Sequence, residues 1–325
     1  MRSATYDHFG KPAEVLSLGD RTTPEPKANE VRVKTILASI HNHDLLTIRG
    51  QYGFKPELPA IGGSEAVGII DAVGKDVKEL KVGQRISAAS VQATWAEYFV
   101  ASEDMVFPMP DSLDDEMAAQ LVAMPLSALM LLEFLDMQSG QWIIHNAANG
   151  AVGKSLAMLA AARGVKTINV VRSADALDEL KALDIKNNIN TSDDDWKDQV
   201  KSIIGNDKIS AAVDSVGGEA SGDLLSLLGH GGTFAVFGAM SGKPMMLNPT
   251  DMIFKQAVLK GFWGSKLSQE MSVENKQRLV EELIDRAVSG KLKLPTEATF
   301  DLADITEAVS GKLQSDKKGK VLLKP

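Results

Sequence analysis

A turn of small residues, directly after a short apolar run, is the part of the chain best suited to bind an anionic ligand. The apolar run is Trp142–Ile144, and the turn Asn146–Gly153 follows at once. Small side chains let a ligand approach the main chain where a helix begins, and the unpaired N–H groups and helix dipole there favour negative charge. The pattern therefore predicts that a phosphate or pyrophosphate binds at this turn.

The elements that would position this turn form a β-α-β unit. We expect a buried strand over 142–144, then a helix whose apolar residues include Leu156 and Leu159 and which ends at Gly164. A second strand over 167–171 completes the unit. Such a unit, followed by further alternating strands and helices, is typical of a Rossmann doubly wound parallel sheet.

The glycine motif of a dinucleotide site is incomplete here. Ala148 occupies its first position, and Gly150 and Gly153 occupy the other two. The strands and helix around the motif favour dinucleotide binding over a glycine-rich turn that holds no nucleotide. The residues expected at the cofactor are those between and beside the motif positions: Asn149, Gly150, Ala151 and Val152.

The end of the second strand indicates which dinucleotide binds. A free ribose 2′-OH usually meets Asp or Glu at this position. This chain has Arg172 followed by Ser173 instead. The guanidinium is a planar fork of donors that suits a phosphate, so we expect NADP(H) as the cofactor, with both residues at its 2′-phosphate. The alternative is an exposed arginine at a strand end that binds nothing.

Composition narrows the class of protein further. The chain has 325 residues, a net charge of −8 and no cysteine. This length allows two domains, and the acidic balance argues against a nucleic-acid partner. The lack of cysteine excludes disulfides, a thiolate nucleophile and cysteine-ligated zinc. No apolar signal segment follows Met1, and the apolar run Leu121–Leu132 is too short to span a bilayer, so we expect a cytoplasmic protein without a membrane segment.

The secondary structure changes character along the chain. Residues 1–117 read mostly as strands separated by Gly and Pro, and a helical pattern begins near Asp114. After the β-α-β unit we expect strands over 209–216 and 232–238, a helix over 219–228, a closing strand over 260–263 and a late helix over 274–289. The fold class predicted is therefore α/β.

The order of these segments resembles the medium-chain dehydrogenase/reductase superfamily over essentially the whole chain. The residues that carry the resemblance are Gly63-Ser64-Glu65-Ala66-Val67-Gly68, Val82-Gly83-Gln84-Arg85, Trp95-Ala96-Glu97-Tyr98 and Gly319-Lys320-Val321-Leu322-Leu323. The resemblance implies a GroES-like, β-rich catalytic domain over 1–117 and 264–325, interrupted by a Rossmann domain over 118–263.

The resemblance also bears on metal binding. Zinc alcohol dehydrogenases of this superfamily usually carry Cys where this chain has His41 and His where it has Ser64. The run His41-Asn42-His43-Asp44 invites a metal interpretation, since imidazole and carboxylate are good ligands. A third ligand is missing at the position that the superfamily uses, so we expect no catalytic metal. His43 is then a loop or packing histidine.

A closer resemblance is to the zinc-free branch of quinone oxidoreductases and mitochondrial-type trans-2-enoyl thioester reductases. It rests on Arg49-Gly50-Gln51-Tyr52-Gly53, Asn146-Ala147-Ala148-Asn149, Ile168-Asn169-Val170-Val171-Arg172, Phe237-Gly238-Ala239-Met240-Ser241-Gly242-Lys243-Pro244, Ile253-Phe254-Lys255 and Gly261-Phe262-Trp263. The resemblance implies that Tyr52 is the catalytic proton donor and that Asn42, Tyr52 and Trp263 contact the substrate. It places Gly238, Ala239, Met240, Phe262, Trp263 and Lys320 at the cofactor, and it implies a homodimer.

The chain also departs from the enoyl reductase pattern. That family has an Asn-Pro-Ser-Asp loop where this chain has His41-Asn42-His43-Asp44, so the usual asparagine is either replaced by His41 or shifted to Asn42. Ser173-Ala174 replace acidic and basic residues, and a second tryptophan is absent after Trp263.

The function predicted is hydride transfer from NADPH to an activated C=C bond of a small molecule, as in 2-enoyl thioester reduction. A tyrosine that stays protonated at neutral pH is suited to protonate the resulting enolate. Two alternatives remain: an NADPH:quinone oxidoreductase, and a non-catalytic NADPH-binding protein with a structural or regulatory role. Tyr52 would then be a surface-loop aromatic, and Trp263 a core or interface residue.

Overall fold

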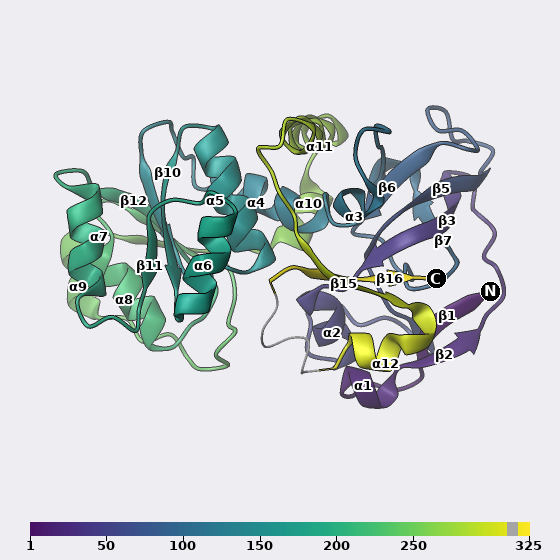
Figure 1. The fold of residues 1–325 in the computed structure, drawn as a ribbon, viewed down its shortest axis with the longest axis horizontal. Helices are drawn as coiled ribbons and strands as arrows, with labels where there is room; N and C mark the ends of the chain where they lie inside the picture. Colours follow the sequence, from purple (N-terminus) through teal and green to yellow (C-terminus); the bar gives the residue numbers. More distant parts are fainter. Residues whose placement is uncertain (311–317) are drawn as a thin grey trace. The chain divides into compact units, whose positions relative to one another are not determined.

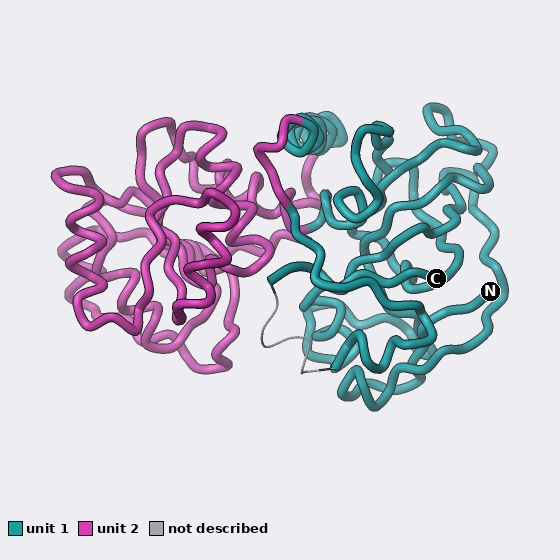
Figure 2. The backbone as a smooth tube through the Cα atoms, viewed as in Figure 1, with its two compact units in different colours: residues 1–123, 273–288, 294–325 teal, residues 124–272, 289–293 magenta. Residues whose placement is uncertain are grey.

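The computed structural model describes residues 1–310 and 318–325 (Figure 1). These residues form two compact units (Figure 2). Unit 1 comprises 1–123, 273–288 and 294–325, and unit 2 comprises 124–272 and 289–293. The domain boundaries predicted at 117/118 and 263/264 stay a prediction.

Unit 1 is β-rich. Its larger sheet has the strand order β15-β16-β3-β5-β6-β8, and β7 also pairs with β3. Its smaller sheet has the order β2-β1-β4. The strands are β1 (Arg2–Tyr6), β2 (Ser17–Asp20), β3 (Glu30–Ser39), β4 (Ala60–Ile61), β5 (Glu65–Val73), β6 (Arg85–Ala89), β7 (Tyr98–Ser102), β8 (Val106–Pro108), β15 (Thr296–Asp301) and β16 (Lys320–Lys324). The helices are α1 (Pro12–Val15), α2 (Asn42–Ile48), α3 (Asp115–Ala118), α11 (Val273–Val288) and α12 (Ile305–Ala308), with 3-10 turns η1 (Glu103–Met105) and η2 (Leu302–Asp304).

Trp95 anchors the core of unit 1. It is fully buried, and its indole Nε1 donates to the carbonyl oxygen of Ser39 at the end of β3, 3.0 Å away. A Cβ atom added to Gly62 or to Gly63 would lie 2.3 Å from the Trp95 ring, so only glycine fits at either position. These contacts fix the backbone just before β5, where the polar residues described below begin.

Unit 2 is an α/β unit. Its parallel sheet has the order β11-β10-β9-β12-β13-β14, with helices flanking it (Figure 1). The strands are β9 (Trp142–His145), β10 (Lys166–Val171), β11 (Asn188–Asn190), β12 (Ile209–Asp214), β13 (Thr233–Val236) and β14 (Val258–Gly261). The helices are α4 (Ala123–Phe134), α5 (Ala151–Ala162), α6 (Ala174–Ala182), α7 (Trp196–Ile204), α8 (Glu219–Leu227), α9 (Pro249–Lys255) and α10 (Gly264–Glu270). This strand order is that of a doubly wound dinucleotide-binding sheet, and it confirms the predicted fold class.

Two predicted elements differ from the structure. The helical pattern expected from Asp114 is split into α3 and α4, because tertiary contacts capture the intervening backbone, as described below. The closing strand β14 ends at Gly261, where its neighbour β13 also ends, rather than at Trp263. In the part of the chain that the structure describes, every helix is too short or too polar to cross a membrane.

Candidate active site

The predicted cofactor residues of unit 2 follow four neighbouring strands. Asn149–Val152 come after β9, Arg172 and Ser173 after β10, Gly238–Met240 after β13, and Phe262 and Trp263 after β14. The carboxyl ends of parallel strands meet at one edge of the sheet. The chain also reverses its winding direction there, since β10 and β12 lie on opposite sides of β9. Such a switch point is where doubly wound sheets bind their ligands.

The turn after β9 has the features that a pyrophosphate requires. Gly150 is the N-cap residue of α5 and offers no side chain to cap the first-turn N–H groups. A Cβ atom added to Gly153 would lie 2.7 Å from backbone atoms of Ala147 and Ala148, so glycine is needed for the helix to pack on its own turn. Uncapped N–H groups at a closely packed helix N-terminus fit a dinucleotide phosphate.

A buried carboxylate that the sequence analysis missed holds this turn in place. Asp214, the last residue of β12, is fully buried. Its Oδ1 accepts from Asn146 Nδ2 at 2.6 Å and from the backbone N–H of Val216 at 2.9 Å. Asn146 Oδ1 in turn accepts from the N–H of Ser215 at 2.7 Å. The turns after β9 and β12 are thus tied together; an aspartate at a strand end was the available signal.

Lys154 does not belong to the cofactor turn, although its place in the sequence suggests phosphate binding. Ala148 to Ser155 match the P-loop spacing except at the first glycine. The Lys154 side chain is only 6% exposed, and its Nζ lies 3.1 Å from Oε2 of Glu179 on α6. The ammonium group pairs with a carboxylate behind the helix, so the P-loop interpretation is excluded.

Arg172 and Ser173 play different roles after β10. Ser173 is the N-cap of α6, and its Oγ accepts from the N–H of Ala176 at 3.3 Å. Arg172 is exposed, and within the described residues its guanidinium forms no hydrogen bond or ion pair. The Arg172 side chain is therefore available to an anionic ligand, whereas the Ser173 hydroxyl is already engaged.

Phe262 and Trp263 also differ in environment. The Phe262 side chain is 5% exposed, stacks on Phe237 with ring centroids 5.5 Å apart, and meets the edge of Phe134. It packs in an aromatic cluster of unit 2. Trp263 is 49% exposed at the N-cap of α10, so its indole is accessible. Met240, in the loop after β13, is exposed as well.

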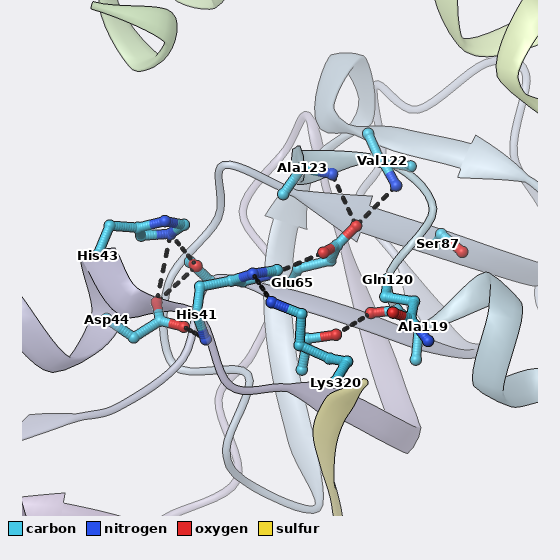
Figure 3. Close-up of polar contacts among 12 residues, drawn as sticks. His41, His43, Asp44, Glu65, Ser87, Ala119, Gln120, Val122, Ala123 and Lys320 are labelled. Carbon is cyan, nitrogen blue, oxygen red and sulfur yellow. Dashed lines mark hydrogen bonds and ion pairs between the residues drawn. The ribbon is translucent and has the colours of Figure 1, made fainter. Parts of the chain in front are cut away.

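In unit 1 the central feature is a buried chain of charged and polar groups around His41 (Figure 3). The His41 imidazole lies between a carboxylate and an ammonium group: its Nε2 is 2.7 Å from Glu65 Oε2, and its Nδ1 is 3.1 Å from Lys320 Nζ. The other oxygen of Glu65 accepts from the N–H groups of Val122 and Ala123 at 2.7 and 2.8 Å. His41 and Glu65 are both fully buried.

The hydrogen-bond directions define the protonation of this chain. A lysine ammonium only donates, so His41 Nδ1 accepts and its proton resides on Nε2, from where it is donated to Glu65. Burial lowers the pKa of His41 well below its usual value, with Lys320 and His43 acting in the same direction, so the ring is neutral. Burial raises the pKa of Glu65 to about 7, while the N–H groups of Ala123 and Val122 oppose that rise.

A second set of polar residues adjoins the first. His43 Nε2 lies 2.7 Å from Ser64 Oγ, and Ser64 donates to Asp44 Oδ1 at 2.6 Å. The His43 ring stacks on His41, with centroids 5.1 Å apart, and its other ring contact is Tyr52, at 5.8 Å. Tyr52 is thereby placed beside the polar groups of α2.

The remaining predicted residues of unit 1 occupy separate places. Asn42 is exposed as the first residue of α2. Lys320 begins β16 and contacts His41, so the structure shows a partner within unit 1. Among the described residues, no group of three or more His, Asp or Glu side chains is arranged to hold a metal ion. The prediction of no metal stays a prediction.

Comparison with known proteins identifies the family. Residues 27–111 match the family model of an alcohol dehydrogenase GroES-like domain, and residues 151–282 match that of a zinc-binding dehydrogenase. The chain is 34% identical to the mitochondrial enoyl-[acyl-carrier-protein] reductase of Homo sapiens over 97% of its length and 86% of that protein. The enzyme of the same name from Caenorhabditis elegans is 35% identical over 98% of this chain and 93% of that protein.

Among solved structures, the quinone oxidoreductase of Escherichia coli complexed with NADPH is similar, with a TM-score of 0.89 and 26% identity. The similarity covers 100% of both chains. These relatives and the two units of the fold confirm the predicted family: the chain belongs to the medium-chain dehydrogenase/reductase superfamily, in its zinc-free branch of NADP(H)-dependent oxidoreductases.

Proposed function

We propose that this protein reduces the activated C=C bond of a 2-enoyl thioester with NADPH. The observation that carries the proposal is the match to mitochondrial enoyl-[acyl-carrier-protein] reductases, which extends over 97% of the chain and includes the Tyr52 motif. The placement of Tyr52 beside the polar groups of α2 supports it. When bound, NADPH supplies the hydride, and the protein supplies position and electrostatics.

The residues of unit 2 fit this cofactor. The uncapped N-terminus of α5 would hold the pyrophosphate, and Arg172 would hold the 2′-phosphate. Arg172→Ala should weaken NADPH binding roughly ten- to a hundredfold while leaving NADH binding nearly unchanged. Both dissociation constants can be measured by fluorescence titration, with Lys181→Ala on the exposed face of α6 as the control. An unchanged ratio between the two cofactors would contradict the role of Arg172.

Tyr52 would supply the proton. Hydride addition to the β-carbon leaves an enolate that must be protonated at the α-carbon, whereas a reduced quinone is protonated on oxygen by water. Tyr52→Phe keeps the ring and removes only the hydroxyl, and it should lower kcat/KM for an enoyl thioester by roughly 10²–10⁴-fold, with little effect on a quinone. Tyr98→Phe on β7 is the matched control. Small, equal losses on both substrates would make Tyr52 a packing residue.

The same assay separates the alternatives. The similarity to solved quinone oxidoreductases favours quinone reduction as the second candidate. Turnover of quinones without turnover of crotonyl thioesters would establish that alternative. A protein that binds NADPH and reduces neither substrate would be a non-catalytic binding protein.

We further propose that activity needs no metal. Both ring nitrogens of His41 are already engaged by Glu65 and Lys320, and His43 Nε2 by Ser64. Exhaustive chelation should leave NADPH oxidation unchanged, with elemental analysis showing no stoichiometric zinc. Loss of activity together with loss of bound zinc would reverse this conclusion.

We also propose a homodimer, formed through the edge of the sheet in unit 2. Strand β14 is at one end of the sheet order, and its neighbourhood exposes large apolar side chains. Ile253 and Phe254 are 67% and 76% exposed, and Val258 and Leu259 are 46% and 43% exposed. An open strand edge with such side chains favours association. Light scattering should give twice the chain mass, and Leu259→Lys should shift it to the monomer.

A cytoplasmic location is likewise a proposal. The chain contains no cysteine, so its stability does not depend on an oxidising compartment. The similar enoyl reductases carry "mitochondrial" in their names, which makes an organelle the competing outcome. Cell fractionation followed by immunoblotting distinguishes the two.

A further inference from the structure

We propose that His43 is a positioning residue that returns a proton to Tyr52 in each catalytic cycle, through a relay with Ser64 and Asp44. The inference rests on the proposed function, since it concerns the proton that alkene reduction consumes. It goes beyond the family pattern, which has serine where this chain has His43.

The position of the His43 ring is fixed on two sides. Its plane lies 11° from that of the buried His41 ring, on which it stacks, and it contacts the ring of Tyr52 at 5.8 Å between centroids. The His43 side chain is 26% exposed, in contrast to His41, which is fully buried. The imidazole of His43 therefore lies between Tyr52 and solvent on one side and buried groups on the other.

The hydrogen bonds assign a direction to the relay. Ser64 has one hydroxyl proton, and it is donated to Asp44 Oδ1, 2.6 Å away. Ser64 Oγ must then accept at His43, so His43 Nε2 carries a proton in this arrangement. The other ring nitrogen, Nδ1, is the one that exchanges a proton with Tyr52. Asp44 also accepts from the backbone N–H of His41 at 2.9 Å, which identifies it as a carboxylate.

The same directions exclude a hydrolytic serine triad. A nucleophilic serine donates its proton to histidine, and the carboxylate orients the opposite ring nitrogen. Here Ser64 donates to Asp44 instead, and Asp44 lies 3.5 Å from the same Nε2 atom that contacts Ser64. The arrangement holds a proton-carrying imidazole in place; it does not activate Ser64.

The proton balance of the cycle then closes. NADPH delivers hydride to the β-carbon, and Tyr52 transfers its hydroxyl proton to the α-carbon of the enolate, which leaves a tyrosinate. The Nδ1–H proton of the His43 imidazolium passes to that oxygen, directly or through one water molecule. Solvent reprotonates His43, whose Nε2–H stays on Ser64 throughout. One enoyl thioester, one NADPH and one proton give one saturated thioester and NADP⁺.

The test compares His43→Gln with His43→Ala. A glutamine amide can still donate to Ser64 but carries no exchangeable acid proton, so a purely structural role predicts that His43→Gln restores activity. The relay predicts that both variants lose roughly tenfold or more in steady-state turnover of a crotonyl thioester, and that neither loses quinone reduction. Free imidazole should rescue His43→Ala and not His43→Gln. His8→Ala, at an exposed histidine of unit 1, is the control.

Stopped-flow kinetics gives the decisive readout. Tyr52 begins the first cycle protonated, so the first turnover of NADPH-loaded His43→Gln should match wild type, and only later turnovers should slow. A slowed first turnover, wild-type steady-state activity of His43→Gln, or equal losses on enoyl and quinone substrates would each overturn the relay. Absence of enoyl turnover in wild type would instead reject the proposed function itself.

Discussion

Each unit of the molecule buries a histidine near the end of a strand, and the two histidines have different partners. His41 follows β3 in unit 1 and bridges the Glu65 carboxylate and the Lys320 ammonium group. His145 ends β9 in unit 2 and contacts a neutral amide, Asn169 Oδ1, at 2.7 Å. Both rings are inaccessible to solvent. Burial lowers the pKa of both, that of His145 to about 4.

The difference shows how two solutions to the same problem carry different risks. Around His145, every group is neutral: the Asn169 amide also donates to the carbonyl oxygen of Lys186 at 2.6 Å. Loss of one contact there leaves an unpaired dipole. Around His41, loss of one contact leaves an unpaired buried charge, which costs much more free energy. The unit 1 arrangement is therefore the more fragile of the two.

The largest expected effect is that of Glu65→Gln. Removing the carboxylate leaves the Lys320 charge without its compensating partner, and we expect the free energy of unfolding to fall by about 3–5 kcal/mol in urea titrations. Glu103→Gln is the matched control, because Glu103 also accepts from two backbone N–H groups, those of Lys78 and Glu79, but on the exposed surface. Equal losses in the two variants would remove the distinction between buried and exposed carboxylates.

The pH dependence should separate the two regions by sign. The pKa of His145 is lowered from 6.5 to about 4, so its contribution to stability is present above pH 6.5 and is lost as the pH falls through 4. The loss amounts to about 3 kcal/mol. His145→Gln should not show it in unfolding experiments at a series of pH values.

Glu65 should act in the opposite direction. Its pKa is raised from 4.5 to about 7, so its contribution is full below pH 4.5 and is lost as the pH rises through 7. Wild type minus Glu65→Gln should therefore fall in stability over the range in which wild type minus His145→Gln rises. Slopes of the same sign would refute the assignment of one of the two pKa shifts.

A smaller effect is expected from Asn169→Leu. The substitution leaves the His145 N–H without its acceptor but exposes no charge, so the free energy of unfolding should fall by about 1–3 kcal/mol. Measured under the same conditions as Glu65→Gln, it gives the comparison directly. A loss as large as that of Glu65→Gln would mean that charge is not what distinguishes the two sites.

The smallest expected effect is that of salt. The pair around His41 is buried, so raising NaCl from about 0.05 to about 0.5 M should change the stability difference between wild type and Glu65→Gln by less than about 0.5 kcal/mol. A larger change would indicate that solvent ions reach the Glu65 carboxylate.

The parts of the molecule that sequence reasoning predicted are those with local signals. The β-α-β unit around Gly153 is encoded by apolar periodicity and glycines within a short stretch, and the structure has it at the expected residues. The family was recognisable because its motifs occur in a fixed order along the chain.

The parts that could not be predicted depend on distant partners. Glu65 binds the N–H groups of Val122 and Ala123, and Gln120 donates to the carbonyl oxygen of Leu294. These contacts interrupt a run of residues that locally favours a helix. Likewise, resemblance assigned Lys320 to the cofactor, and nothing near it in the sequence indicates that its Nζ contacts His41.

The position of β16 has a consequence for how the chain acquires its structure. β16 follows all of unit 2 in chain order, yet it lies inside the large sheet of unit 1, between β15 and β3, with Val321, Leu322 and Leu323 fully buried. On the ribosome, the first strands of unit 1 emerge early but lack a neighbour, whereas nearly all of unit 2 is one continuous segment. We therefore expect unit 2 to fold first during synthesis, while unit 1 waits with an open edge beside β3 for its final strand, as long-range pairing is slow and exposes unpaired strand edges.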